Sequence, residues 1–270
     1  MSTSSAPVEI GRVGLTVRDL TRTADYYRRL LGLATLQSDG STMILGAGDT
    51  PLLELRSDPA ARQSSRREAG LFHTAFLMPA RADLGAWLRH VAQAQIPVTG
   101  ASDHLVSEAL YLDDPEGNGI EVYVDRPRET WMTDDGTIRM ATERLDIDDL
   151  LAAAGPAYVE APEGMVIGHV HLQVGDVAQA EGFYRDRLGF EVKAHYPGAS
   201  FLSTGGYHHH LGANVWNSRG AGVRTYPSTG LAELELRADD APYQALVARL
   251  GTDKPTDPWG TEIVLTRKAS

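Results

Sequence analysis

The chain has 270 residues, no cysteine and a formal net charge of −11. Its length suits one large domain or two smaller ones, and it is sufficient to bury a hydrophobic core. The lack of cysteine excludes disulfides, cysteine-based zinc sites and thiol nucleophiles. An acidic chain without clustered Lys and Arg predicts no nucleic-acid partner. No apolar run approaches the ~20 residues of a membrane span, and the polar N-terminus lacks a signal-peptide core. We therefore expect a cytoplasmic protein with no membrane partner.

The first predicted elements recur later in the chain. The stretch IGRVGLTVRDLTRTADYYRRLLGL from Ile10 alternates as a strand, continues with helical spacing and stops at a glycine. Aligned without gaps against IGHVHLQVGDVAQAEGFYRDRLGF from Ile167, ten of 24 positions are identical. Each copy is followed by a β-rich segment. This repeat predicts that the fold is built from similar strand–helix–strand units.

Two further segments share this order without the sequence signature. GLFHTAFLMP predicts a strand, ADLGAWLRHVAQAQI a helix, and EALYLDDPEGNGIEVYVD a hairpin around a Pro-Glu-Gly-Asn turn. GLAELELRADD, APYQALVARLG and TEIVLTR repeat the plan in shorter form. We therefore expect four βαβββ units, beginning near Ile10, Leu71, Ile167 and Leu231.

The units divide the chain into two predicted domains. Residues 1–126 hold the first two units and residues 166–270 hold the last two. A polar linker at residues 127–165 separates them and contains the short helical stretch IDDLLAAAG.

Strand alternation indicates which polar side chains share a face. In HVHLQV, His169, His171 and Gln173 lie opposite an apolar face that should pack on a helix. The same argument places His73 of FHTAFLM and Glu121 of GIEVYVD on the polar face of their strands.

Three consecutive histidines open the apolar segment HHHLGANVW. If this segment alternates strictly, Leu211 lies on the helix side together with His209. His208 and His210 then point to the opposite, polar face. A bulge before Leu211 would invert this assignment.

Two segments resemble the vicinal oxygen chelate superfamily, HVHLQVGDVAQAEGFYRDRLGF and ALYLDDPEGNGIEVY. This superfamily includes glyoxalase I, bleomycin-resistance proteins and extradiol dioxygenases. The stretches HLVSEALYLDDPEGNGIEVYVDRPRETW and GGYHHHLGANVW are most similar to bacterial catechol 2,3-dioxygenase-type proteins. The resemblance implies an α+β fold in which paired units form two cup-shaped half-barrel modules. In this superfamily the cup surrounds a metal that the substrate chelates through two oxygens.

The resemblance implies one ligand near the start of a unit's first strand and another on its last strand. Units two and three supply His73, Glu121 and His169 at these positions. Two histidines and one carboxylate form a facial triad suited to non-haem Fe(II), and Mn(II) would fit the same ligands. Such a site requires units two and three to pair, across the linker or between subunits.

Units one and four offer a poorer ligand set. Arg12 and Glu54 occupy the positions in the first unit, and Glu233 and Val264 those in the fourth. We therefore expect a metal-free remnant, closed by an ion pair between Arg12 and a carboxylate.

The extradiol pattern implies further site residues. Tyr111 lies ten residues before Glu121, where these enzymes carry a tyrosine that contacts the substrate, and His104 precedes it in the segment that carries an outer histidine. The family also has an acid–base histidine on the last strand of the third unit, which implies His208 or His210 here.

The resemblance favours an Fe(II)-dependent extradiol dioxygenase whose partners are a small aromatic diol and O₂, and a homo-oligomer is compatible with it. One alternative is a glyoxalase-type metal isomerase or lyase, with His210 as a fourth ligand. Another is a non-catalytic binding or resistance protein. One fold hosts all three functions, so the site must decide between them.

Overall fold

A computed structural model describes residues 6–132 and 137–268. The larger of its two sheets has eight strands, in the order β10-β11-β12-β9-β5-β8-β7-β6. The second predicted unit contributes β5 (Gly70–Leu77), β6 (Gly100–Asp103), β7 (Ser107–Asp113) and β8 (Gly119–Asp125). The third contributes β9 (Val166–Gln173), β10 (Glu191–Tyr196), β11 (Ala199–Ser203) and β12 (Leu211–Asn214).

The smaller sheet has six strands, in the order β14-β13-β1-β4-β3-β2. The first unit contributes β1 (Val8–Val17), β2 (Ala34–Ser38), β3 (Thr42–Ala47) and β4 (Thr50–Ser57). The fourth contributes β13 (Gly230–Ala238) and β14 (Glu262–Arg267).

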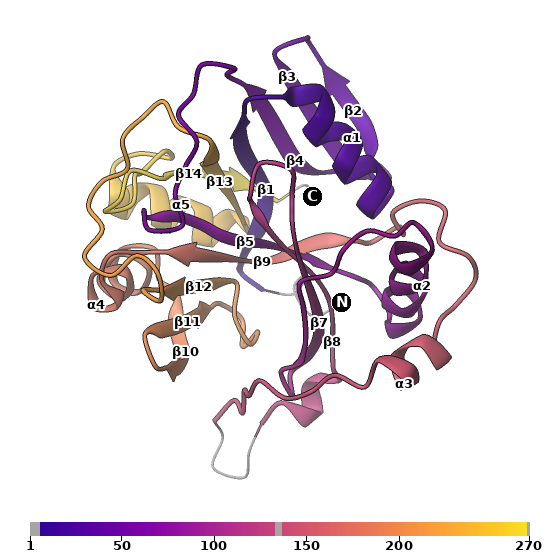
Figure 1. Cartoon of the computed structure of the whole chain (residues 1–270). Coiled ribbons are helices and arrows are strands. Elements are labelled where there is room, and N and C mark those ends of the chain that lie inside the picture. The colour runs from indigo at the N-terminus through magenta and orange to yellow at the C-terminus, as the bar shows by residue number, and fades with distance from the viewer. Residues whose placement is uncertain (1–5, 133–136, 269–270) are drawn as a thin grey trace.

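Each sheet is joined at its centre by strands from distant parts of the chain. β1 pairs antiparallel with β13, and β5 pairs antiparallel with β9. Figure 1 shows indigo β1 beside yellow β13, and purple β5 crossing beside pink β9. Units two and three therefore pair within a single chain. The domain boundaries at residues 126 and 166 stay a prediction, since each sheet contains strands from both sides of them.

The α+β class and the two half-barrel sheets agree with the prediction, but the fourth unit is shorter than a full βαβββ repeat. After its helix it contributes only β14. The ten residues that follow Gly251 form bends and turns and make a single bridge, from Thr256 to Glu262. Pro255 and Pro258 lie in this segment, and proline disfavours a central paired strand.

The helices pack on the strands of their own units, and the short linker helix packs on the helix of the second unit. They are α1 (Leu20–Leu31), α2 (Arg81–Gln93), α3 (Ile147–Ala152), α4 (Val177–Glu181) with the π-helical turn η2 (Gly182–Arg187), α5 (Asp240–Leu250) and the 3-10 turn η1 (Arg128–Thr130). The Asp19 side chain caps α1 by accepting a hydrogen bond from the backbone N–H of Arg22. Gly32 ends it at φ 64°, a left-handed conformation that favours glycine. The predicted glycine stop of the first helix is therefore confirmed.

The two faces of the central strands have different chemistry. Phe76 of β5, Val122 of β8 and Val170 of β9 are buried in the main hydrophobic core beneath the helices. The opposite face of the same strands carries His73 and Glu121 and lines a cavity. This alternation, which was predicted from the sequence, places polar ligands inside the curve of the eight-stranded sheet.

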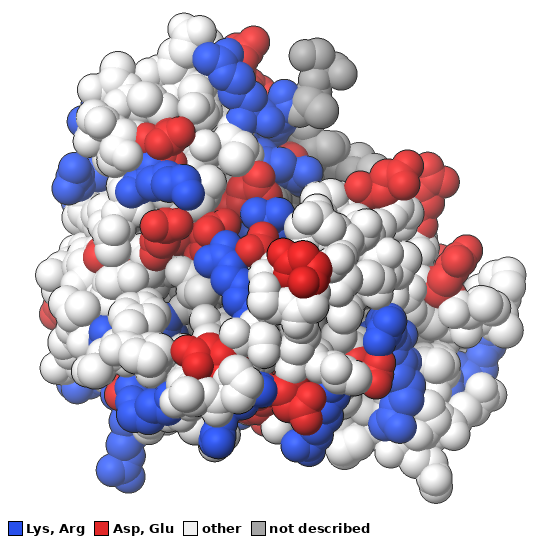
Figure 2. Space-filling model, turned by 90° about the horizontal axis from the view of Figure 1, so that it is seen from above, with Lys and Arg blue, Asp and Glu red and all other residues white. Residues whose placement is uncertain are grey.

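Charged side chains of both signs are interspersed on the surface of the molecule. Figure 2 shows Lys and Arg beside Asp and Glu across the face seen from above, including a mixed group near its centre. Within the described residues, no helix is long and apolar enough to cross a membrane.

Candidate metal centre

Three side chains from three adjacent strands converge on one point. Glu121 of β8 and His169 of β9 both lie opposite Ala75 of β5, and His73 lies two residues before Ala75 on the same face. The registers of the two strand pairs therefore bring the three side chains together across a small alanine.

The ligand atoms of this trio are close enough to share one ion. His73 Nε2 lies 2.9 Å from Glu121 Oε2, and His169 Nε2 lies 3.2 Å from the same oxygen. The two Nε2 atoms are 3.4 Å apart. Among the described residues, only these three His, Asp or Glu side chains form a group whose ligand atoms all lie within 4.8 Å of one another. Two imidazoles and a carboxylate fit a divalent first-row metal.

The environment favours the metal-binding protonation states. Burial lowers the pKa of His169 to about 4, although Glu121 beside it acts in the opposite direction. Burial raises the pKa of Glu121, but His169 and His73 outweigh this effect and hold that pKa well below its usual range. At neutral pH the trio therefore offers a neutral imidazole and an ionised carboxylate, the forms that bind metal.

Ring packing orients His169. Its Nδ1 is buried and has no hydrogen-bond partner among the described residues. The ring instead packs against His209 and Tyr123, with centroids 4.1 Å and 4.9 Å away. These contacts leave Nε2 directed at Glu121.

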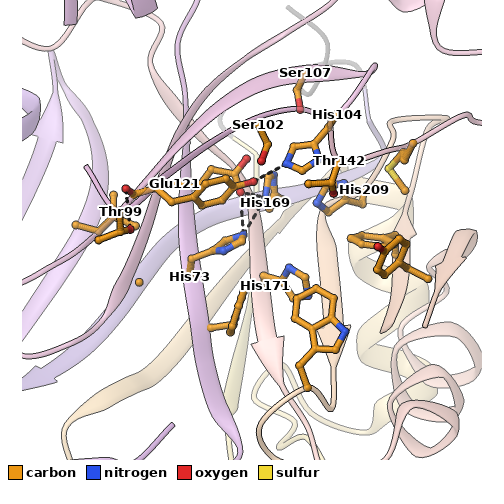
Figure 3. Close-up of a pocket in the computed structure, with 18 of the residues that line it drawn as sticks. His73, Thr99, Ser102, His104, Ser107, Glu121, Thr142, His169, His171 and His209 are labelled. Carbon is orange, nitrogen blue, oxygen red and sulfur yellow. Dashed lines mark hydrogen bonds and ion pairs between the residues drawn. The ribbon is translucent and has the colours of Figure 1, made fainter. Parts of the chain in front are cut away.

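The trio forms one wall of a cavity of about 460 Å³, a size suited to a small organic molecule. Figure 3 shows His73, Glu121 and His169 facing this space, with His171 and His209 beside them. The remaining wall is largely aromatic and apolar, and includes Phe72, Val106, Leu112, Ile120, Met140, Tyr196, Phe201 and Trp216.

Tyr111 and His104 lie together at this cavity, as the predicted pattern implies. The Tyr111 hydroxyl lies 2.6 Å from His104 Nε2, and His104 Nδ1 lies 2.7 Å from the carbonyl of Ala141. Because that carbonyl can only accept, His104 donates from Nδ1 and accepts the tyrosine hydroxyl at Nε2. Burial and the nearby Glu121 charge raise the pKa of Tyr111 well above its ordinary value, so this hydroxyl keeps its proton.

The predicted orientation of the triple histidine is wrong. His209, not His208 or His210, lines the cavity. Strand β12 begins only at Leu211, after a turn in which Gly205 and Gly206 have φ of 61° and 71°. The three histidines therefore precede the regular strand, and strict alternation does not apply to them.

His210 points away from the candidate metal centre. Its Nδ1 accepts a hydrogen bond from the Thr204 backbone N–H at 3.3 Å, and its ring packs on Tyr207. His208 is fully buried behind His209 and bonds to Asp125. The geometry therefore supports neither a fourth metal ligand at His210 nor direct substrate contact by His208.

Sequence patterns do not assign several residues that line the cavity or lie behind its wall. His209 was placed on the wrong face. Asp125 had no motif, and Phe201 and Trp216 carry no pattern that separates a cavity wall from ordinary core packing. The one available signal was the position of Asp125, two residues after Tyr123 on the predicted polar face of the same strand.

The cup of the six-stranded sheet contains an ion-pair network. Arg12 lies 2.9 Å from Glu54 and 3.6 Å from Glu233. Arg56, which no sequence pattern indicates, lies 2.6 Å from each of the same two carboxylates. The expected pair between Arg12 and a carboxylate is therefore present, within a larger network of two cations and two anions.

Comparison with known proteins identifies the family to which this fold belongs. The sequence profile described as "Glyoxalase/Bleomycin resistance protein/Dioxygenase superfamily" matches residues 9–122 and 166–249. The chain belongs to this superfamily. Over 237 residues it is 41% identical to a protein of Bacillus subtilis (strain 168) named catechol-2,3-dioxygenase. The alignment covers 86% of this chain and 83% of that relative.

Solved structures of the superfamily share the fold at low identity. A protein of Bacillus subtilis subsp. subtilis str. 168 described as a "putative dioxygenase" matches with a TM-score of 0.64 and 15% identity, over 97% of this chain and 86% of that one. Glyoxalase I from Zea mays matches with a TM-score of 0.56 and 16% identity, over 96% and 92% of the two chains. At these identities the likeness supports the fold alone. The chemistry has to be inferred from the residues of the site.

Proposed function

We propose that this superfamily member is an Fe(II)-dependent extradiol dioxygenase that opens the ring of a catechol. The observation that carries the proposal is the buried His73–Glu121–His169 set at the wall of an aromatic-lined cavity. The name of the 41% identical Bacillus subtilis relative supports the same reaction class.

The three ligand atoms fit a facial triad. His73, Glu121 and His169 would hold a divalent first-row ion, and that ion would supply the oxygen chemistry of a non-haem Fe(II) oxygenase. Fe(II) suits the oxygen chemistry, and the same ligands would accept Mn(II). The aromatic wall provides an apolar surface for the substrate ring.

The surrounding side chains suit the handling of a catechol. Tyr111 donates its one proton to His104, so its hydroxyl oxygen can accept a hydrogen bond from a substrate hydroxyl at one side of the cavity. His209 presents Nε2 to the cavity, and this atom has no hydrogen-bond partner among the described residues. An imidazole there can take a catechol proton and return it to the product. We propose His209 for this role in place of His210 and His208.

No specific observation favours the other two functions, a glyoxalase-type enzyme and a non-catalytic binding protein. A glyoxalase-type site was expected to use His210 as a fourth ligand, and His210 points into the packing around Tyr207. A purely binding protein has no need of a buried ligand trio, which costs free energy to desolvate.

The proposal is tested by anaerobic loading of the protein with Fe(II), followed by catechol and then air. We expect binding of one iron per chain, uptake of O₂ and a yellow ring-opened product. Glu121→Ala should lose both iron and turnover, whereas Glu181→Gln, on the outer helix α4, should keep both. If iron binds and a broad panel of catechols gives no turnover, the proposed function is wrong.

A further inference from the structure

Behind His209, a line of hydrogen bonds runs from the cavity wall to the end of β8. His209 Nδ1 lies 2.8 Å from His208 Nδ1, and His208 Nε2 lies 2.8 Å from Asp125 Oδ1. His208 is fully buried, and the Asp125 side chain is 11% exposed. We call these three residues the Asp125–His208–His209 triad.

The chemistry of the groups sets the direction of the hydrogen bonds. The Asp125 carboxylate can only accept, so His208 donates from Nε2. A neutral His208 then has an acceptor at Nδ1, and His209 must donate to it from its own Nδ1. This leaves the Nε2 of His209 unprotonated, with its lone pair facing the cavity.

Aromatic packing keeps the triad in place. The His208 ring packs against Tyr207 and Trp131, with centroids 4.1 Å and 4.9 Å away. The Tyr207 hydroxyl donates a further hydrogen bond to Asp125 at 3.0 Å. At the other end, the His209 ring packs against His169, so its direction is set by the candidate metal centre as well as by His208.

We propose that Asp125 and His208 are positioning residues that fix the tautomer and ring orientation of His209, so that the lone pair of its Nε2 faces the bound substrate. The proposal rests on the proposed function for its substrate, a catechol. The arrangement follows the physical logic of a catalytic triad, in which a buried carboxylate selects the tautomer of the imidazole that performs acid–base work. Neither Asp125 nor His208 touches the substrate.

The tautomer can be measured without turnover. In the full-length chain with ¹⁵N-labelled histidine and no added metal, long-range ¹H–¹⁵N correlation spectra distinguish protonated from unprotonated ring nitrogens. We expect His209, assigned with the variant His209→Gln, to carry its proton on Nδ1 in the wild type. Asp125→Leu and His208→Phe should each convert it to a mixture of tautomers, because they remove the acceptor chain but retain similar volume.

Kinetics with Fe(II) and catechol form the second arm. For both variants we expect kcat to fall by about tenfold or more, within the ~10²–10⁴ range of general acid–base effects. The KM for catechol and the iron content should change little, which a simply misfolded site would not allow. Glu181→Gln is the matched control, because it removes a carboxylate 2.7 Å from an exposed histidine, His195, on the outer surface.

The possible outcomes separate the two proposals. Protonation of His209 on Nε2 in the wild type, or a tautomer that persists in both variants, would overturn the positioning role. A wild-type kcat in both variants would overturn it as well. The expected tautomer in a protein that never cleaves a catechol would support the positioning of His209 and refute the proposed function.

Discussion

Ala75 shows how much the candidate metal centre depends on one small side chain. It is fully buried on the cavity side of β5, and both Glu121 and His169 lie opposite it in the strand pairing. A larger side chain would occupy the space across which the two ligands approach each other. A small side chain at this position therefore leaves room for the two ligands to approach each other.

We predict that Ala75→Val weakens metal binding by about tenfold or more while the fold is retained, since an added branch in a packed core costs about 1–3 kcal/mol. Isothermal titration with Mn(II) or Fe(II) measures this directly. The control is Thr74→Val on the opposite face of β5, where the buried hydroxyl has no hydrogen-bond partner in the described part of the chain, so that its loss should leave stability equal or higher. Unchanged metal affinity in Ala75→Val would show that the size of this side chain does not limit the approach of Glu121 and His169.

Buried neutral histidines make the fold sensitive to acid. Burial lowers the pKa of His169 to about 4 and that of His210 to about 3, both below the ~6.5 of an exposed imidazole. Between these values the unfolded chain binds protons that the native state does not, so the free energy of unfolding falls as pH drops below about 6.5. The slope approaches about 1.4 kcal/mol per pH unit for each such histidine.

Urea unfolding of the protein without added metal, at several pH values between 7 and 5, checks this expectation. His210→Phe should reduce the slope by the contribution of one histidine, because His210 lies outside the cavity. An equal slope in wild type and variant would mean that His210 is already protonated in the native state.

Among the secondary-structure elements, the alternation of side chains along a strand correctly predicted their orientation where the strands are regular. It failed where the backbone is irregular. His73, Glu121 and His169 lie within long central strands, and their shared face could be read from period-two patterning. The triple histidine follows a turn with two left-handed glycines, so its side chains are placed by tertiary packing. No local pattern encodes the contact of His209 with His169, which depends on where the segment meets β9.

The pairing of elements was also only partly predictable. The distribution of ligand residues among the units implied that units two and three meet, and β5 and β9 are neighbours. Whether they meet within one chain could not be read from the sequence, because it depends on the path of residues 127–165. The sequence showed that the fourth unit is shorter than the others, but not that it has only two strands.

The two sheets of the molecule form related cups that differ in the charged groups they contain. One contains a ligand trio in a cavity, and the other contains the Arg12–Arg56–Glu54–Glu233 network. In this network the guanidinium groups occupy the space between carboxylates that could otherwise hold a cation. We therefore predict one metal ion per chain.

Arg12→Leu should destabilise the fold by about 1–3 kcal/mol, because Glu54 and Glu233 lose a charged partner in a partly buried site. Metal stoichiometry should remain at one ion per chain. Chemical denaturation and metal analysis measure the two effects. Lys254→Ala, which removes an exposed ion pair with Glu262, serves as the control and should change stability by less than about 1 kcal/mol. Two ions per wild-type chain would contradict this reading of the second cup.

The reaction of the anaerobic iron-loaded protein with catechol and a measured amount of O₂ tests the proposed dioxygenase activity directly. We predict that one O₂ is consumed for each catechol, with a yellow ring-opened product, and that Glu121→Ala and His73→Ala abolish both. A protein that holds one iron per chain through these residues, binds catechols and consumes no O₂ would contradict it.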